Sequence, residues 1–189
     1  MSNLLHAGPD TNAGALPKIA GIGSRKTPKA ILEWMKLMGA EIVKNGFWLA
    51  SGNASGADQA WATGANTVNP RRVHICLPWD EFERDQIWDA NRLTVYTELP
   101  RQTKRQISSL IKALHPAGDR LSDVHLALLG RNALIVHQAS AVIGWMNPER
   151  PGGTGMAYIL ARRWNIPVFN VATEAERQAA ESEIKKRAA

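Results

Sequence analysis

Short apolar segments alternate with longer amphipathic segments along most of the chain. The short segments carry few charges and are four to six residues long, which is typical of buried strands rather than helices. They are the segments 18–23, 47–50, 72–77, 141–146 and 166–171.

The intervening segments carry apolar residues at helical spacing. After the first predicted strand, Pro28 suits the first turn of a helix, and Gly46 is placed to end it. Further helices are predicted over 57–66, 101–115 and 122–139, and another follows the fourth strand. Such alternation indicates a parallel sheet covered on both faces. We therefore predict an α/β protein: a single Rossmann-like, doubly wound domain with a mainly parallel sheet of about five strands.

The same pattern predicts how the chain is divided. Residues 1–17 are rich in Gly, Asn, Asp and Pro and lack periodicity, so we expect a mobile N-terminal tail. Residues 18–171 form the predicted Rossmann-like domain, in which 78–121 is an irregular, charged middle segment. Residues 172–189 predict a charged C-terminal helix that begins with a capping box of Thr173 and Glu176.

Composition restricts the class of protein. The chain has 189 residues, of which 44% are hydrophobic, enough for one domain with a sizeable core. No apolar run approaches the roughly 20 residues of a membrane-spanning helix, and the first residues do not resemble a signal peptide. Cys76 is the single cysteine, which excludes an internal disulfide framework. We expect a cytoplasmic protein without a membrane partner.

The formal net charge is +6. An excess of Lys and Arg favours polyanionic partners, because neutralising phosphates drives nucleic-acid binding. A basic surface that is merely solvated fits the charge equally well.

Three predicted strand-to-helix loops have unusual chemistry: GIGSRKTP, SGNASGAD and RPGGTGM. Their glycines allow close backbone approach, and each loop opens a helix whose N-terminus favours an anion. Tight turns needed only for packing are the alternative. Neither the G-x-G-x-x-G fingerprint nor a P-loop fits, because Lys26 and Arg25 stand where those motifs need glycine. The candidate nucleotide- or phosphate-binding residues are Gly23, Ser24, Arg25, Ser51, Gly52, Ala54, Gly56, Asp58, Gly152, Gly153, Thr154 and Gly155.

Three longer stretches carry a family resemblance: GIGSRKTP, LASGNASGADQAWATGA and PGGTGMAYILARRWNIPVFNV. In this order they resemble the SLOG superfamily, which includes the DNA-processing protein DprA and the lonely-guy phosphoribohydrolases. HPAGDRLSDVHLALLGRN further resembles small phage and bacterial DprA-like proteins. The resemblance covers Lys18 to Val171. It implies a Rossmann-like fold, nucleotide or nucleic-acid binding through these loops, a homodimer or larger homo-oligomer, and a pocket that Arg131 and Asn132 face.

The chain departs from both named groups. Lonely-guy enzymes carry P-G-G-x-G-T-x-x-E, whereas here Met156 replaces the threonine and Ile159 the glutamate. The motif therefore does not support phosphoribohydrolase activity, and no catalytic residue is assigned. DprA proteins are longer and have additional domains, so their role is only an analogy here.

Several side chains allow two interpretations. Asp58 either stabilises a helix N-terminus or accepts a ribose hydroxyl. Arg131 lies on a helix with an apolar stripe. If its side chain is buried, it needs an anionic partner. The alternative is an arginine at the surface that forms a salt bridge there. The five histidines and Cys76 show no metal-ligand spacing, so no metal and no cofactor is expected. Trp79 and Trp88, with Lys104 and Arg105, are candidates for nucleic-acid contact; covering a sheet edge or forming a dimer contact is the alternative for the tryptophans.

These observations predict a SLOG-type protein that binds a nucleotide or a nucleotide-like phosphate. The first alternative is a DprA-like protein that binds single-stranded DNA in DNA processing or recombination. The second is a nucleoside N-glycosidase, similar to a phosphoribohydrolase, that uses another carboxylate.

Overall fold

The structure, a computed structural model, describes residues 17–150 and 152–188. The predicted tail over 1–17 therefore lies almost wholly outside the described residues. Six strands form one sheet in the order β4-β3-β2-β1-β5-β6, and every neighbouring pair is parallel. The strands are β1 (Lys18–Gly23), β2 (Trp48–Ser51), β3 (Val73–Leu77), β4 (Arg92–Val95), β5 (Ala141–Trp145) and β6 (Val168–Asn170).

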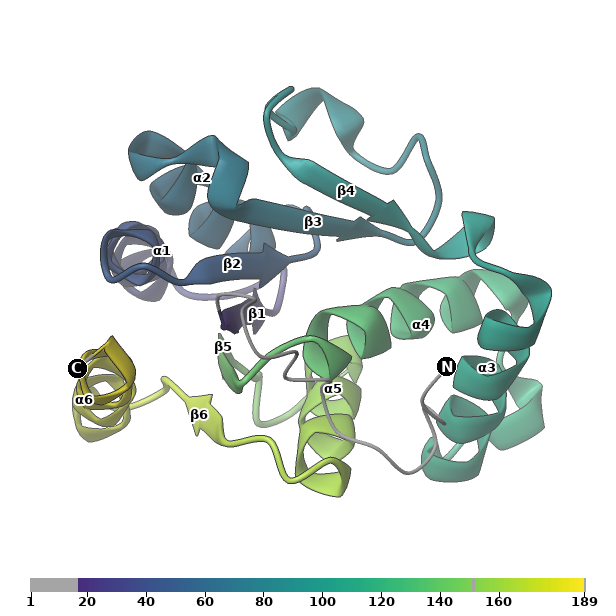
Figure 1. Cartoon of the computed structure of the whole chain (residues 1–189). Helices are drawn as coiled ribbons and strands as arrows, with labels where there is room; N and C mark the ends of the chain where they lie inside the picture. The colour runs from purple at the N-terminus through teal and green to yellow at the C-terminus, as the bar shows by residue number, and fades with distance from the viewer. Residues whose placement is uncertain (1–16, 151, 189) are drawn as a thin grey trace.

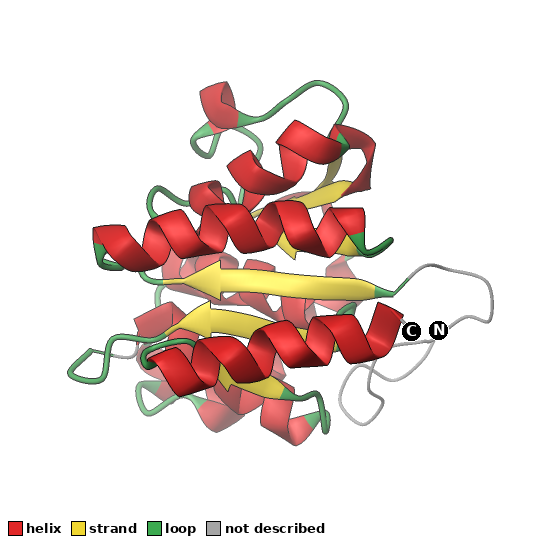
Figure 2. Ribbon diagram, turned by 90° about the vertical axis from the view of Figure 1, so that its left-hand side faces the viewer, coloured by secondary structure: helices red, strands yellow, loops and turns green. Residues whose placement is uncertain are grey.

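Helices cover both faces of this sheet, as Figures 1 and 2 show. One face carries α1, α2 and α6, and the other carries α3, α4 and α5. The helices are α1 (Lys29–Lys44), α2 (Ala57–Val68), α3 (Arg101–Leu114), α4 (Asp123–His137), α5 (Gly152–Arg163) and α6 (Glu174–Ala188). The predicted α/β, Rossmann-like architecture is confirmed.

Side chains that alternate along the strands pack into two hydrophobic cores, one on each face of the sheet. In β1, Ile19 packs with α1 and α2, whereas Ala20 and Ile22 pack with the α4 and α5 face. Central strands that are apolar on both faces explain why the sequence shows continuous apolar runs rather than strict alternation.

The sheet contains one strand more than the about five predicted. The additional strand, β4, pairs only with β3 and forms an edge of the sheet. Arg92 is exposed, and Leu93 and Thr94 are half-buried, so the strand carries no apolar run. It lies in the charged middle segment, where the sequence predicted no strand.

Other boundaries differ by a few residues. The last predicted strand, 166–171, is reduced to Val168–Asn170, and the helix predicted over 57–66 extends to Val68. The predicted capping box is present: Thr173 N–H donates to Glu176 Oε2 at 2.8 Å, and Glu176 N–H donates to Thr173 Oγ1 at 3.2 Å.

Candidate functional site

The order of the strands creates a crevice at the carboxyl edge of the sheet. From β1 the chain proceeds to β2 on one side, and it returns as β5 on the other side of β1. Loops that leave β1 and β5 therefore run to opposite faces, which is where ligands bind in doubly wound sheets. A cavity of about 1030 Å³ lies here.

Most of the predicted binding residues meet in this cavity. Gly52, Gly56, Gly155 and Ser51 do not line it, and the Ser51 hydroxyl is buried and donates to Gly21 O at 2.7 Å. The predicted residues that line the cavity are Gly23, Ser24, Arg25, Ala54, Asp58, Arg131, Asn132, Gly152, Gly153 and Thr154. Their role in binding stays a prediction.

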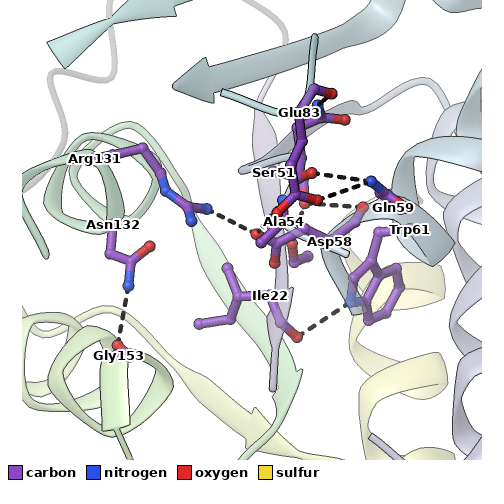
Figure 3. A network of polar contacts seen from close by, with 12 residues as sticks. Ile22, Ser51, Ala54, Asp58, Gln59, Trp61, Glu83, Arg131, Asn132 and Gly153 are labelled. Carbon is purple, nitrogen blue, oxygen red and sulfur yellow. Dashed lines mark hydrogen bonds and ion pairs between the residues drawn. The ribbon is translucent and has the colours of Figure 1, made fainter. Parts of the chain in front are cut away.

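A buried ion pair joins α2 to α4 at the cavity wall (Figure 3). Arg131 Nη1 donates to Asp58 Oδ2 at 2.7 Å, and the two side chains are only 6% and 5% exposed. Asp58 is thus the anionic partner that a buried Arg131 needs, and the surface salt bridge is ruled out. Gly52 makes room for the pair, because a Cβ atom there would overlap the Arg131 guanidinium.

Asp58 Oδ2 is held by two protein partners. Besides Arg131, its Oδ2 accepts a hydrogen bond from Ala54 N–H at 3.3 Å. Burial raises the pKa of the Asp58 carboxyl, and the Arg131 guanidinium and the Ala54 N–H oppose that shift.

The hydrogen-bonding capacity of the Arg131 guanidinium is not fully used by protein partners. Its Nε is buried and has no hydrogen-bond partner within the described residues. The guanidinium carbon lies 5.8 Å from the centre of the Phe82 ring, within range for a cation–π contact. A guanidinium with an unpaired donor favours an anion with acceptor oxygens.

The turn before α2 already holds a carboxylate of the protein itself. Glu83 Oε2 accepts from Ser55 N–H at 2.7 Å and from Gln59 Nε2 at 3.2 Å, and Glu83 Oε1 lies 3.2 Å from Arg25 Nη2. Asn53 Nδ2 donates to Glu83 O at 2.6 Å. The N-terminus of α2 therefore attracts an anion, as the sequence predicts for such a turn, and the anion bound there is the Glu83 carboxylate.

Glu83 was not identified from the sequence. It belongs to the irregular segment after β3, and no local motif brings it next to Ser55. Both Glu83 (φ 44°) and Asn53 (φ 67°) adopt the left-handed conformation, which is uncommon away from glycine. Their mutual hydrogen bond holds this conformation in place.

The opening of α5 differs from that of α2. Gly152 and Gly153 are exposed and line the cavity, and Asn132 Nδ2 donates to Gly153 O at 3.1 Å. Arg131 and Asn132 are neighbours on the continuous helix α4. This places Asn132 against the first turn of α5.

Cationic side chains outnumber carboxylates around the cavity. The carboxylates are Asp58 and Glu149, and the cations are Arg25, Lys26, Arg120, Arg131 and Arg150. Sequence reasoning did not assign Arg120, Arg150 or Glu149 to the site. Arg120 belongs to the connection between α3 and α4, and a tertiary arrangement of this kind has no local signal, whereas Glu149 and Arg150 lie in the loop between β5 and α5, part of which the sequence does mark.

Several solved structures share the fold of this chain. Neither a family model nor a curated protein sequence matches the chain. DNA processing protein A from Helicobacter pylori superposes with a TM-score of 0.58 at 17% identity, over 100% of this chain and 77% of that chain. The Streptococcus pneumoniae protein gives 0.59 at 17% identity, over 90% of this chain and 56% of that chain. The Moco carrier protein of Chlamydomonas reinhardtii gives 0.53 at 20% identity, over 92% and 87%.

The chain shares their Rossmann-like fold. The Rossmann-like fold that the resemblance implies is thereby confirmed. The chain spans little more than half the length of the DprA from Streptococcus pneumoniae.

The predicted nucleic-acid contacts lie outside the cavity. Lys104 Nζ donates to Thr97 O at 2.6 Å, and Arg105 is exposed on α3. Trp79 is half-buried and packs edge-to-face on Phe82 at 5.2 Å, so little of its ring is free to stack. Trp88 is 48% exposed.

Three other features of the described residues bear on metal binding, membrane spanning and the position of the lonely-guy glutamate. No group of three or more His, Cys, Asp or Glu side chains in the described residues could hold a metal ion. No helix in the described part of the chain is long and apolar enough to cross a membrane. Ile159, at the position of the lonely-guy glutamate, is 42% exposed and does not line the cavity.

Proposed function

We propose that the protein binds a nucleotide, or a nucleotide derivative, through a phosphate group in the cavity at the carboxyl edge of the sheet. The observation that carries the proposal is Arg131, a buried guanidinium that lines the cavity with its Nε unpartnered in the described structure. Burying a cation is costly unless it is paired and hydrogen-bonded. Asp58 supplies one partner, and a phosphate oxygen would supply the other.

The first turn of α5 supplies the second half of this phosphate site. Gly153 is exposed to the cavity and has no side chain of its own to keep a phosphate from the backbone; the Asn132 amide lies beside it. The N-terminus of α5 adds a partial positive charge, and Ser24 and Arg25 from the loop after β1 lie on the same cavity.

The turn before α2 is assigned a different role in this proposal. Its anion place is filled by Glu83, which also pairs with Arg25. We therefore place the ligand phosphate between α5 and the loop after β1. The turn that contains Ser55 stabilises the cavity wall.

Proteins that share the fold support ligand binding in general. One is named as a carrier of the molybdenum cofactor, and DNA processing protein A is described as binding single-stranded DNA. The fold thus accommodates a small cofactor in one protein and a polynucleotide in another.

Binding of single-stranded DNA is the second candidate function. It is favoured by the exposed Arg101 and Arg105 on α3, a helix that ends at the cavity with His115. A nucleoside N-glycosidase is less well supported, because Asp58 is held by Arg131 and Ile159 lies outside the cavity. Assembly into a homodimer or larger oligomer stays a prediction.

Mass spectrometry of small molecules released from the purified protein by denaturation tests the main proposal. We expect a phosphate-bearing nucleotide in the wild type and less of it in Gly153→Val, whose side chain would occupy the approach to α5. Thr63→Ala, an exposed change on α2, is the control and should match the wild type. Equal nucleotide in all three proteins would place the ligand elsewhere. If the wild type releases no ligand, titration with added AMP tests whether the protein binds a nucleotide at all. Failure to bind AMP or any other phosphorylated nucleotide refutes the proposal.

A further inference from the structure

The cavity follows α4 for about two helical turns. Its wall on this helix consists of His125, Leu128, Leu129 and Asn132, together with Arg131. The spacing i, i+3, i+4, i+7 places the first four of these residues on one face of the helix. At 1.5 Å per residue, the levels of His125 and Asn132 are about 10 Å apart along the helix axis.

The character of the wall changes along this length. Asn132, Arg131 and Gly153 form a polar end, which is the proposed phosphate site. Leu128 and Leu129 form an apolar middle, to which Leu121 also contributes. At about 1030 Å³ the cavity reaches the upper end of the roughly 300–1,000 Å³ found for small-molecule pockets, so it has room beyond one phosphate and a sugar.

The far end of the cavity is again rich in hydrogen-bond donors. His115 Nδ1 accepts from Ala117 N–H at 3.1 Å, so the neutral ring carries its proton on Nε2. His125 Nδ1 lies 2.8 Å from Ser122 Oγ, and that oxygen accepts from His125 N–H at 3.3 Å. When the Ser122 hydroxyl donates to Nδ1, the neutral ring carries its proton on Nε2 and can donate it to a ligand.

Arg120 adds a full positive charge at this end. It is exposed and lines the cavity, and within the described chain only its Nε is hydrogen-bonded, to Ala117 O at 3.5 Å. Its two terminal nitrogens therefore remain available to an anion, in the bidentate manner that arginine offers to phosphate.

We propose that His115, Arg120 and His125 form a second phosphate subsite, and that the ligand is a nucleotide with phosphates at two separate ends. The ribose would join the two phosphates, and the base attached to it would pack against the apolar middle of the cavity. The inference rests on the proposed function for the first phosphate. It adds a ligand class, nucleoside bisphosphates or short dinucleotides, and assigns three residues to recognising the second phosphate.

Calorimetric titration at 0.15 M salt with three probes tests this subsite. Adenosine 3′,5′-bisphosphate carries its second phosphate on the 3′ side of the ribose, away from the first; ADP carries it beside the first, and AMP lacks it. We expect the bisphosphate to bind at least 10-fold more tightly than AMP, and ADP to bind about as AMP does. Arg120→Gln and His125→Gln should each remove most of that preference, lowering bisphosphate affinity far more than AMP affinity, and Arg163→Gln, an exposed change on α5, should alter nothing.

The outcomes separate the two proposals. If neither AMP nor the bisphosphate binds the wild type, the proposed function fails, and this inference fails with it. If AMP and the bisphosphate bind with equal affinity, the second subsite is refuted while the proposed function stands. A gain for ADP equal to that for the bisphosphate would mean that charge alone matters, which also refutes the subsite. The same holds if Arg120→Gln weakens all three probes equally.

Discussion

At the scale of single residues, Asp58 and Arg131 depend on each other. Both side chains are almost completely buried, and each supplies the charge that the other needs. Removing one partner of a buried pair leaves an uncompensated charge and typically costs about 3–5 kcal/mol. We expect Asp58→Asn to lower the free energy of unfolding by that amount, as measured by urea denaturation.

The double variant Asp58→Asn, Arg131→Met separates pairing from packing. It removes both charges, so we expect it to regain most of the lost stability and, under the proposed function, to lose nucleotide binding. If Asp58→Asn unfolds at the same urea concentration as the wild type, the pair does not hold the cavity wall as described here.

His74 makes the stability of the protein depend on pH. Burial lowers the pKa of the imidazole to about 3 from an ordinary value of 6.5, and Lys18 and Arg92 nearby add to the shift. The unfolded chain therefore takes up a proton below pH 6.5, whereas the folded protein does so only near pH 3. Stability is lost as the pH falls through this window, by on the order of 4 kcal/mol.

Urea denaturation at several pH values between 7 and 3.5 measures this effect. His74→Gln keeps polar atoms near Lys18 Nζ and Thr94 Oγ1, which lie 3.2 and 2.9 Å from the imidazole nitrogens, but it cannot titrate. We expect its stability to fall less steeply with acid than that of the wild type, since carboxylates that titrate in this range are common to both proteins. Parallel curves would contradict the assignment.

At the scale of elements, α1 and α2 approach each other through a glycine. A Cβ atom on Gly64 would overlap the Lys36 carbonyl oxygen, which belongs to the backbone of α1 and cannot rotate away. In an isolated helix, alanine is favoured over glycine by about 1 kcal/mol. Here we expect Gly64→Ala to destabilise the protein by about 1–3 kcal/mol, because the helices must separate.

Thermal and urea denaturation of Gly64→Ala and Thr63→Ala checks this prediction. Thr63 is the exposed neighbour on the same helix, and its replacement should change stability by no more than about 0.5 kcal/mol. A Gly64→Ala protein as stable as the wild type would show that the two helices do not pack as closely as the structure has them.

The sequence predicts the central elements well and the edge of the sheet poorly. Segments such as 18–23 and 72–77 are buried on both faces, so continuous apolar runs mark them. β4 has only one neighbouring strand and half-exposed side chains, and nothing in the pattern distinguishes it from a charged loop.

The same contrast applies to the candidate site. Glycine-rich turns after β1 and β5 follow directly from local sequence, and the structure places both on the cavity. Glu83, Arg120 and His125 reach it through segments that fold back from elsewhere in the chain, and their positions follow from tertiary packing. Asp58 and Arg131 were both candidates, but their pairing across 73 positions carries no local signal.

At the scale of the whole molecule, the excess of positive charge allows the DNA-binding alternative to be tested. A strand that crosses α3 would contact Lys104 and Arg105, and each phosphate contact contributes about −0.7 to the slope of log affinity against log salt. If the protein binds single-stranded DNA in this way, Lys104→Glu with Arg105→Glu should make the slope shallower by about 1.4 and leave AMP binding intact. Fluorescence anisotropy with a labelled oligonucleotide at several salt concentrations measures the slope. An unchanged slope would exclude a DNA strand that crosses α3.

The central claim is that a nucleotide phosphate binds between the β1 loop and the first turn of α5. Titration of isotope-labelled protein with AMP, followed by amide chemical shifts, tests it most directly. We expect saturable shifts at Ser24, Gly153 and Thr154, with little change at Ser55, whose N–H is held by Glu83. Arg25→Ala should weaken AMP binding by about 10-fold, as for the loss of one charge-assisted hydrogen bond, whereas Arg71→Ala at an exposed site should not. An absence of saturable shifts, or shifts confined to residues outside the cavity, would contradict the account.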